Sequence, residues 1–91
     1  MKYGVHTFTR GPTREPGSIA TLASTCDRLG FDYYGVSDHV IVSAQIDSPY
    51  PYTEDGSWPC ASDTDCIDCL TTLSFVAANT KRARLLTSVM V

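Results

Sequence analysis

The stretch Tyr33-Tyr34-Gly35-Val36-Ser37-Asp38-His39 decides the fold of this chain. Its first residues are typical of a buried parallel strand, and polar side chains follow where that strand ends. In α/β sheets and barrels, ligands bind at the carboxyl ends of the strands. Asp38 and His39 are therefore candidate functional residues, because a carboxylate beside an imidazole commonly holds and tunes a proton-transfer group.

The residues before this stretch predict a strand and a helix. Residues 2–7 are typical of a short strand, and a loop rich in Gly and Pro follows. Ser18 is placed to cap a helix, and Gly30 to end it in the left-handed conformation. Apolar residues recur between them at three- and four-residue steps, which predicts one buried helical face. These residues are Ile19, Leu22, Ala23, Cys26 and Leu29.

The residues after it predict a long loop, a second helix and a third strand. Residues 38–62 are irregular, and loops of this length are usually functional or disordered; the aromatic residues in this one favour a function. Ser62 or Asp63 is placed to cap a helix over 64–79, and residues 84–90 are typical of a strand. The helix face predicted to be buried comprises Ile67, Leu70, Leu73, Ser74 and Ala77.

This order of elements indicates an α/β fold, a parallel β-α-β-α-β segment with right-handed crossovers. Parallel sheets need both faces covered, yet no further helix follows the third predicted strand before Val91. A TIM (β/α)8 barrel needs roughly 250 residues. We therefore expect residues 1–91 to be the N-terminal portion of a single TIM-barrel domain, with the remainder of the barrel absent from this chain.

Composition argues against several classes of function. The net charge is −3 and no basic run is present, which disfavours binding to nucleic acid or to an anionic membrane surface. No apolar stretch approaches the ~20 residues of a membrane span. Met1 leads directly into the first strand pattern without the features of a secretory signal, so we expect a cytoplasmic protein.

The four cysteines are expected to be reduced thiols in a chain without a signal sequence. Cys66 and Cys69 form a C-x-x-C pair, but they fall within the predicted second helix, where this spacing also results from core packing. Buried, unreactive cysteines are the favoured interpretation. The alternatives are a zinc site formed by Cys60, Cys66, Cys69 and His39, or a redox pair.

The chain resembles the N-terminal portion of the luciferase-like monooxygenase family, a set of flavin- and deazaflavin-dependent TIM-barrel oxidoreductases. The resemblance extends over nearly the whole chain and is carried by the order and spacing of short motifs. These are Tyr3-Gly4-Val5-His6, Leu29-Gly30-Phe31-Asp32, Val36-Ser37-Asp38-His39, Asp47-Ser48-Pro49-Tyr50-Pro51-Tyr52, Leu70-Thr71-Thr72-Leu73 with Ala77-Ala78, and Leu86-Thr87-Ser88-Val89. Ser-Asp-His followed by a Thr-Ser-Val strand is most similar to the branch that uses coenzyme F420.

The resemblance implies a set of roles. His39 would give or take the proton that accompanies hydride transfer between the cofactor and a small organic substrate. Asp38, Ser88 and Val89 would bind the cofactor, which is F420 or, alternatively, FMN. Ser88 and Val89 match a strand bulge that in the family often holds a non-proline cis peptide. No metal is implied. A full-length member would form homo-oligomers, and this chain alone would be inactive.

Simpler interpretations stand beside these roles. Asp38 and His39 alternatively begin a loop as a helix cap and a solvent-facing imidazole. His6 is predicted to be a core histidine facing the helices, although the barrel interior is the other possibility. Tyr50, Tyr52 and Trp58 would form a substrate lid or anchor the loop. The whole chain could also be a non-catalytic protein that completes its sheet by association.

Overall fold

A computed structural model describes residues 1–39, 41, 43–58 and 65–90. The chain runs through strand β1 (Gly4–Phe8), a 3-10 turn η1 (Gly11–Arg14), helix α1 (Pro16–Leu29), strand β2 (Tyr33–Asp38), helix α2 (Cys69–Ala78) and strand β3 (Arg84–Met90). The three strands are parallel and lie in the order β1-β2-β3. The predicted α/β class and parallel pairing are therefore confirmed.

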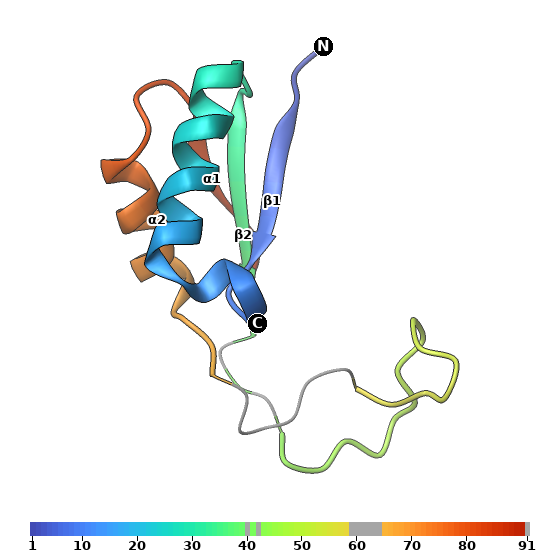
Figure 1. The fold of residues 1–91 in the computed structure, drawn as a ribbon. Coiled ribbons are helices and arrows are strands. Elements are labelled where there is room, and N and C mark those ends of the chain that lie inside the picture. The colour runs from blue at the N-terminus through green and yellow to red at the C-terminus, as the bar shows by residue number, and fades with distance from the viewer. Residues whose placement is uncertain (40, 42, 59–64, 91) are drawn as a thin grey trace.

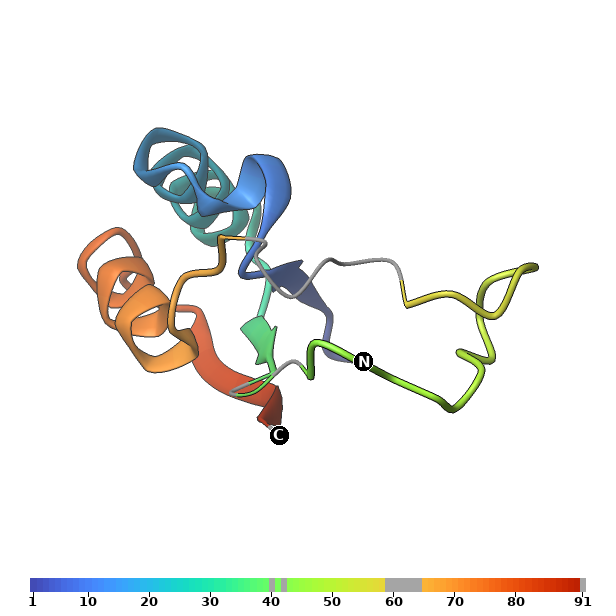
Figure 2. The same ribbon diagram turned by 90° about the horizontal axis from the view of Figure 1, so that it is seen from below.

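Both helices cover the same face of the sheet, and residues 43–58 extend away from them (Figures 1 and 2). Within the described residues, the opposite face carries no helix; we call it the helix-free face. Alternate residues of each strand point to opposite faces. Tyr34 and Val36 of β2 are buried beneath the helices, so Gly35 and Ser37 lie on the helix-free face.

The core lies between the sheet and the two helices. Tyr34 is almost fully buried, and its hydroxyl accepts a hydrogen bond from Thr7 Oγ1 at 3.3 Å, which satisfies a polar group that would otherwise be costly to bury. The buried apolar cluster comprises Ile19, Ala23, Cys26, Tyr34, Val36, Cys69, Leu73 and Val76.

Helix α1 begins earlier than predicted. Its first residue is Pro16 and its N-cap is Glu15, which makes no side-chain capping bond, so the assignment of the cap to Ser18 is wrong. Proline is favoured in the first turn because its missing N–H has no intrahelical partner there. Gly30 ends the helix with φ +83°, as predicted, but Leu29 is 62% exposed rather than buried.

Helix α2 is shorter than predicted and is turned differently. It begins at Cys69 because Asp68 is its N-cap and accepts a hydrogen bond from the backbone N–H of Thr71. Residues 65–68 are therefore not helical, and the predicted caps Ser62 and Asp63 lie outside the described residues. The buried face is not the predicted one, since Leu70 is 56% exposed. The residues that are buried are Cys69, Thr72, Leu73 and Val76.

The strands agree more closely with the prediction. β1 is displaced by one or two residues, β2 is one residue longer, and β3 has the predicted bounds. The start of β3 is held by Asp27 of α1, whose Oδ1 accepts hydrogen bonds from the backbone N–H groups of Arg82 (2.8 Å) and Ala83 (2.9 Å).

Candidate functional site

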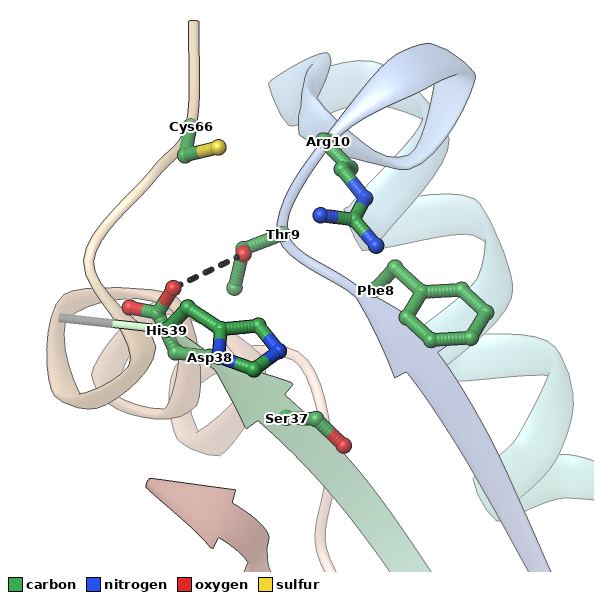
Figure 3. Close-up of a pocket in the computed structure, with 7 residues that line it drawn as sticks. All are labelled: Phe8, Thr9, Arg10, Ser37, Asp38, His39 and Cys66. Atoms are coloured by element: carbon green, nitrogen blue, oxygen red, sulfur yellow. Dashed lines mark hydrogen bonds between the residues drawn. The ribbon is translucent and has the colours of Figure 1, made fainter. Parts of the chain in front are cut away.

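The carboxyl ends of β1 and β2 lie side by side, because Phe8 pairs with Ser37 in the parallel register. Polar side chains from both ends enclose a pocket of about 50 Å³ (Figure 3). The segment that leads into α2 closes one side of it. The pocket is lined by Phe8, Thr9, Arg10, Ser37, Asp38, His39 and Cys66.

The Asp38 carboxylate ties α2 to the sheet. Oδ1 accepts a hydrogen bond from Thr9 Oγ1 at 3.3 Å, and Oδ2 accepts one from the backbone N–H of Cys69 at 3.1 Å. Cys69 is the first residue of α2, and the first N–H groups of a helix have no partner inside the helix. Negative charge is also favourable at this end of the helix dipole. Asp38 therefore has a structural task that the sequence did not reveal.

His39 follows β2 directly, and its side chain is exposed. The imidazole contacts the indole of Trp58 edge-to-face, with 5.0 Å between ring centroids. Trp58 in turn contacts Tyr50 at 4.7 Å, and Tyr50 contacts Tyr52 at 5.4 Å. A chain of aromatic rings thus connects the long loop to the candidate proton-transfer residue.

The same aromatic residues border a second, larger pocket of about 410 Å³. His39 and Trp58 lie on its boundary, with Ile41, Ile46, Tyr50 and Pro51 among the other residues. His39 lines both pockets, so a ligand in either one would contact the imidazole. This arrangement suits a substrate lid, although it equally anchors the loop to the rim of the sheet.

His6 lies on the helix-free face, so its assignment as a core histidine facing the helices is wrong. The neighbouring β1 residue Thr7 is buried on the helix side, and the alternation of the strand places His6 on the other side, where it is exposed. Its Nε2 is hydrogen-bonded to Ser37 Oγ. The helix-free face therefore carries a second imidazole close to the end of β2.

Strand β3 contains a bulge at the position that the family resemblance implies. Val36 pairs with Thr87 and Ser37 pairs with Val89, which leaves Ser88 without a partner in β2. A Cβ atom added to Gly35 would come within 2.8 Å of Ser88 Oγ, so the Ser88 side chain lies on the helix-free face above Gly35. All peptide bonds of the described residues are trans, and the implied cis peptide is not observed.

The structure brings the candidate residues onto two sides of β2. Ser88 and Val89 lie on the helix-free face beside Gly35 and Ser37, whereas the Asp38 carboxylate is engaged with Thr9 and α2. Arg10 was not singled out from the sequence, because it precedes Gly11 and Pro12 in what reads as a loop. Its signal was its position two residues after the end of β1, since neighbouring parallel strands end at the same edge of a sheet.

The cysteines take different positions. Cys26 and Cys69 are buried in the core, and burial raises the pKa of both thiols; the Asp38 carboxylate raises that of Cys69 further. Cys66 is exposed and precedes α2, so the placement of the C-x-x-C pair inside the helix is wrong. Cys60 lies outside the described residues. Among residues 1–39, 41, 43–58 and 65–90, no three His, Cys, Asp or Glu side chains gather as metal ligands.

No helix in the described parts of the chain has the length and apolar character needed to span a membrane. Comparisons of the chain with protein-family models, with curated proteins and with solved structures find no match. Any functional assignment therefore depends on the residues, on the geometry of the site and on the resemblance of the motifs.

Proposed function

We propose that this chain is the first part of a TIM-barrel oxidoreductase similar to the luciferase-like family. Full-length protein would transfer hydride between a deazaflavin, coenzyme F420, or alternatively FMN, and a small organic substrate. In this proposal residues 1–91 supply the first three strands of the barrel, and the helix-free face is the barrel interior. The resemblance of the motifs also motivates the expectation that the full-length protein is a homo-oligomer.

The observation that carries the proposal is the bulge at Ser88. Ser88 of β3 has no partner in β2, and its side chain lies on the helix-free face. Ser88 and Val89 are the two residues that resemble the cofactor-binding bulge of the family. Bulges are common beside active sites, where they redirect a side chain or a peptide group. The three parallel strands also end at one edge of the sheet, which is where α/β folds bind ligands.

The residues near the bulge fit the flat ring of such a cofactor. Gly35 has no side chain, and Leu86 and Val89 present partly exposed apolar groups on the same face. A flat apolar surface suits the face of the cofactor ring, and backbone groups at the bulge would form hydrogen bonds with the edge of that ring. When bound, the cofactor would supply the hydride chemistry.

His39 would hold or release the accompanying proton. An imidazole changes its charge near neutral pH and can act in both directions. Its contact with Trp58 fixes one side of the ring, and its position on the boundary of both pockets gives a substrate access to it. Asp38 would bind the cofactor, while its carboxylate also holds α2 in place.

The first test determines the intact mass of the protein as its own cell makes it. A product of ~30–40 kDa, the size of a whole barrel with insertions, agrees with the proposal. That protein is then titrated with F420 and with FMN, and binding is followed by cofactor fluorescence. Stoichiometric binding of one of them supports the proposal, and binding of neither contradicts it.

His39→Ala in the same full-length protein tests the catalytic role. Turnover with the cofactor is expected to fall by ~10²–10⁴, as for loss of a general acid or base. The dissociation constant of the cofactor is expected to change little. Gln45→Ala, at an exposed position of the same loop, is the matched control and should keep full turnover. Unchanged turnover of the His39 variant would remove His39 from the mechanism.

A second candidate is a non-catalytic protein whose sheet is completed by association. The exposure of the β3 side chains favours it, since Val89 and Met90 are 48% and 55% exposed and an open strand edge can pair with another chain. A native product near 9.9 kDa whose mass in sedimentation increases with concentration would support this candidate. A monomer at all concentrations would contradict it.

A further inference from the structure

We infer that Arg10, facing His39 across the smaller pocket, binds a carboxylate group of the ligand. The inference deepens the proposed function, because it rests on that function for identifying the ligand as the substrate. The substrate would then be a small organic acid, in which the carboxylate is attached to an apolar group. The site itself is argued from the surroundings of Arg10.

Arg10 carries an uncompensated charge at the edge of the sheet. Its Cζ atom lies 5.7 Å from the ring centroid of Phe8 and 6.0 Å from that of Trp58, distances at which a guanidinium is attracted to aromatic faces. In the described part of the chain, no carboxylate forms an ion pair with it and its side chain makes no hydrogen bond. Contacts with ring faces leave the N–H groups at the edge of the guanidinium available for a ligand.

Arg14 provides the contrast. It lies only four residues further along, yet it forms ion pairs with Glu15 at 3.5 Å and with Asp65 at 3.0 Å. The charge of Arg14 is therefore compensated within the protein, whereas that of Arg10 is directed at the pocket. Figure 3 shows Arg10 and His39 reaching toward the same space from the ends of β1 and β2.

The pocket has room for one anionic group. Its volume of about 50 Å³ corresponds to roughly three or four water molecules. Asp38 also lines it, but its two oxygens accept hydrogen bonds from Thr9 and from Cys69, so this carboxylate is already partnered. The nearby negative charge still disfavours a doubly charged phosphate more than a singly charged carboxylate. An arginine binds a carboxylate through two parallel hydrogen bonds.

The larger pocket indicates what the carboxylate is attached to. Among the described residues that line it, none other than His39 has an acidic or a basic side chain; the rest are aliphatic, aromatic, proline and serine residues. Trp58 borders this pocket and also stacks with Arg10. Its Nε1 is buried and has no acceptor among the described residues, which adds a second unpaired donor to the cluster. An apolar body in the larger pocket would place a carboxylate within reach of both.

The test uses isothermal titration calorimetry on the protein at the length that its cell produces. The probes are benzoate, its neutral analogue benzamide, and phenyl phosphate. Benzoate is expected to bind at least tenfold more tightly than benzamide. Arg10→Gln should weaken benzoate binding by roughly 10- to 100-fold, as expected for loss of a charge-assisted hydrogen bond, and leave benzamide unaffected. Arg28→Gln, at an exposed position on α1, is the control and should bind benzoate normally.

The outcomes separate this inference from the proposed function. Equal affinity for benzoate and benzamide, or benzoate binding that Arg10→Gln does not weaken, overturns the carboxylate site. Tighter Arg10-dependent binding of phenyl phosphate than of benzoate overturns the choice of carboxylate in favour of phosphate. F420 and FMN are titrated in parallel. Arg10-dependent benzoate binding by a protein that binds neither cofactor supports the anion site and refutes the oxidoreductase.

Discussion

Replacement of Asp38 by alanine should destabilise the fold through two named hydrogen bonds. The variant leaves the backbone N–H of Cys69 and the hydroxyl of Thr9 without their acceptor. Cys69 is 1% and Thr9 4% exposed, so water does not replace the lost carboxylate easily. A buried donor left unpaired costs ~1–3 kcal/mol. The Thr9 hydroxyl can rotate to another partner, so we expect a total loss of ~2–4 kcal/mol.

This loss is large for a chain of 91 residues, whose total stability is expected to be roughly 5–14 kcal/mol. It should lower Tm by roughly 8 °C or more and is measured by urea unfolding followed by far-UV circular dichroism. Asp38→Asn is the matched control. Its carbonyl oxygen can accept from Cys69 and its amide can donate to the Thr9 hydroxyl, so the expected cost is about 1 kcal/mol or less.

The asparagine variant also separates the two roles of Asp38. It keeps the shape and removes the charge, so weaker cofactor binding by Asp38→Asn in a stable fold would identify a contribution of the charge to the site. An Asp38→Ala protein with stability within about 0.5 kcal/mol of the parent would refute the reasoning. It would mean that the N-terminus of α2 finds other partners and does not depend on Asp38.

Three further predictions concern other parts of the fold. Gly35→Ala places a Cβ 2.8 Å from Ser88 Oγ and 3.2 Å from Leu86 Cδ1; because both are ends of side chains that can rotate away, the cost should be at the low end of overpacking, about 1 kcal/mol, and a loss of ~3 kcal/mol or more in urea unfolding would contradict this relief. The pKa of Asp27 is lowered, chiefly by hydrogen bonds from the backbone N–H groups of Ala83 and Arg82, just before β3. Its stabilising contribution is therefore present above pH ~4 and is lost as the pH falls below that value. The difference in stability between the parent and Asp27→Asn should accordingly shrink between pH 6 and pH 3, and a constant difference would count against this role. Burial raises the pKa of the Cys26 and Cys69 thiols, so both should resist iodoacetamide at pH 8 until urea unfolds the protein. Mass spectrometry showing rapid labelling of either in the native state would refute their burial.

The sequence predicted the strands well because strands have strong local signals. Aromatic and β-branched residues at Tyr33 to Val36 identified the central strand, and Gly30 identified the end of α1 through its left-handed conformation. The start of α1 was missed because Ser18 is a better capping residue than Glu15. Pro16 was the signal that should have decided it, since proline favours the first helical turn.

Helix α2 was harder because its apolar residues are spread around the helix rather than gathered on one face. Leu70 and Phe75 are exposed while Leu73 and Val76 are buried, so the spacing of apolar residues does not distinguish the two sides. Tertiary contacts determine which side of α2 is buried. The backbone N–H of Cys69 is bound by the Asp38 carboxylate, and its Sγ atom lies 3.7 Å from the carbonyl oxygen of Val36. Both contacts depend on how β2 and α2 pack.

The place of Asp38 and His39 in the fold was predictable, but the contacts of their side chains were not. Both residues lie at the carboxyl end of β2, as the sequence predicted, and this is the edge where parallel sheets bind ligands. The direction in which Asp38 points depends on where α2 begins. The exposure of His6 depends on which of the two strand faces the helices cover, which the two-residue period of a strand does not reveal by itself.

A last prediction concerns the bulge at Ser88 and follows from the alternation of side chains between the two faces of a strand. Thr87 pairs with Val36, which is buried on the helix side of the sheet, and Val89 pairs with Ser37 on the helix-free face. Deletion of Ser88 would make Thr87 and Val89 consecutive, which restores regular alternation and leaves every other residue on its present face. The deletion variant should therefore fold, with a far-UV spectrum like that of the parent. If the bulged backbone supports the cofactor, the variant should bind it roughly tenfold or more weakly, a change of ~1.4 kcal/mol, whereas Ser88→Ala, which keeps the bulge, should bind normally. Equal weakening in both variants would assign the contact to the hydroxyl group. Unchanged binding in the deletion variant would remove the bulge from the site, and with it the observation on which the oxidoreductase proposal rests.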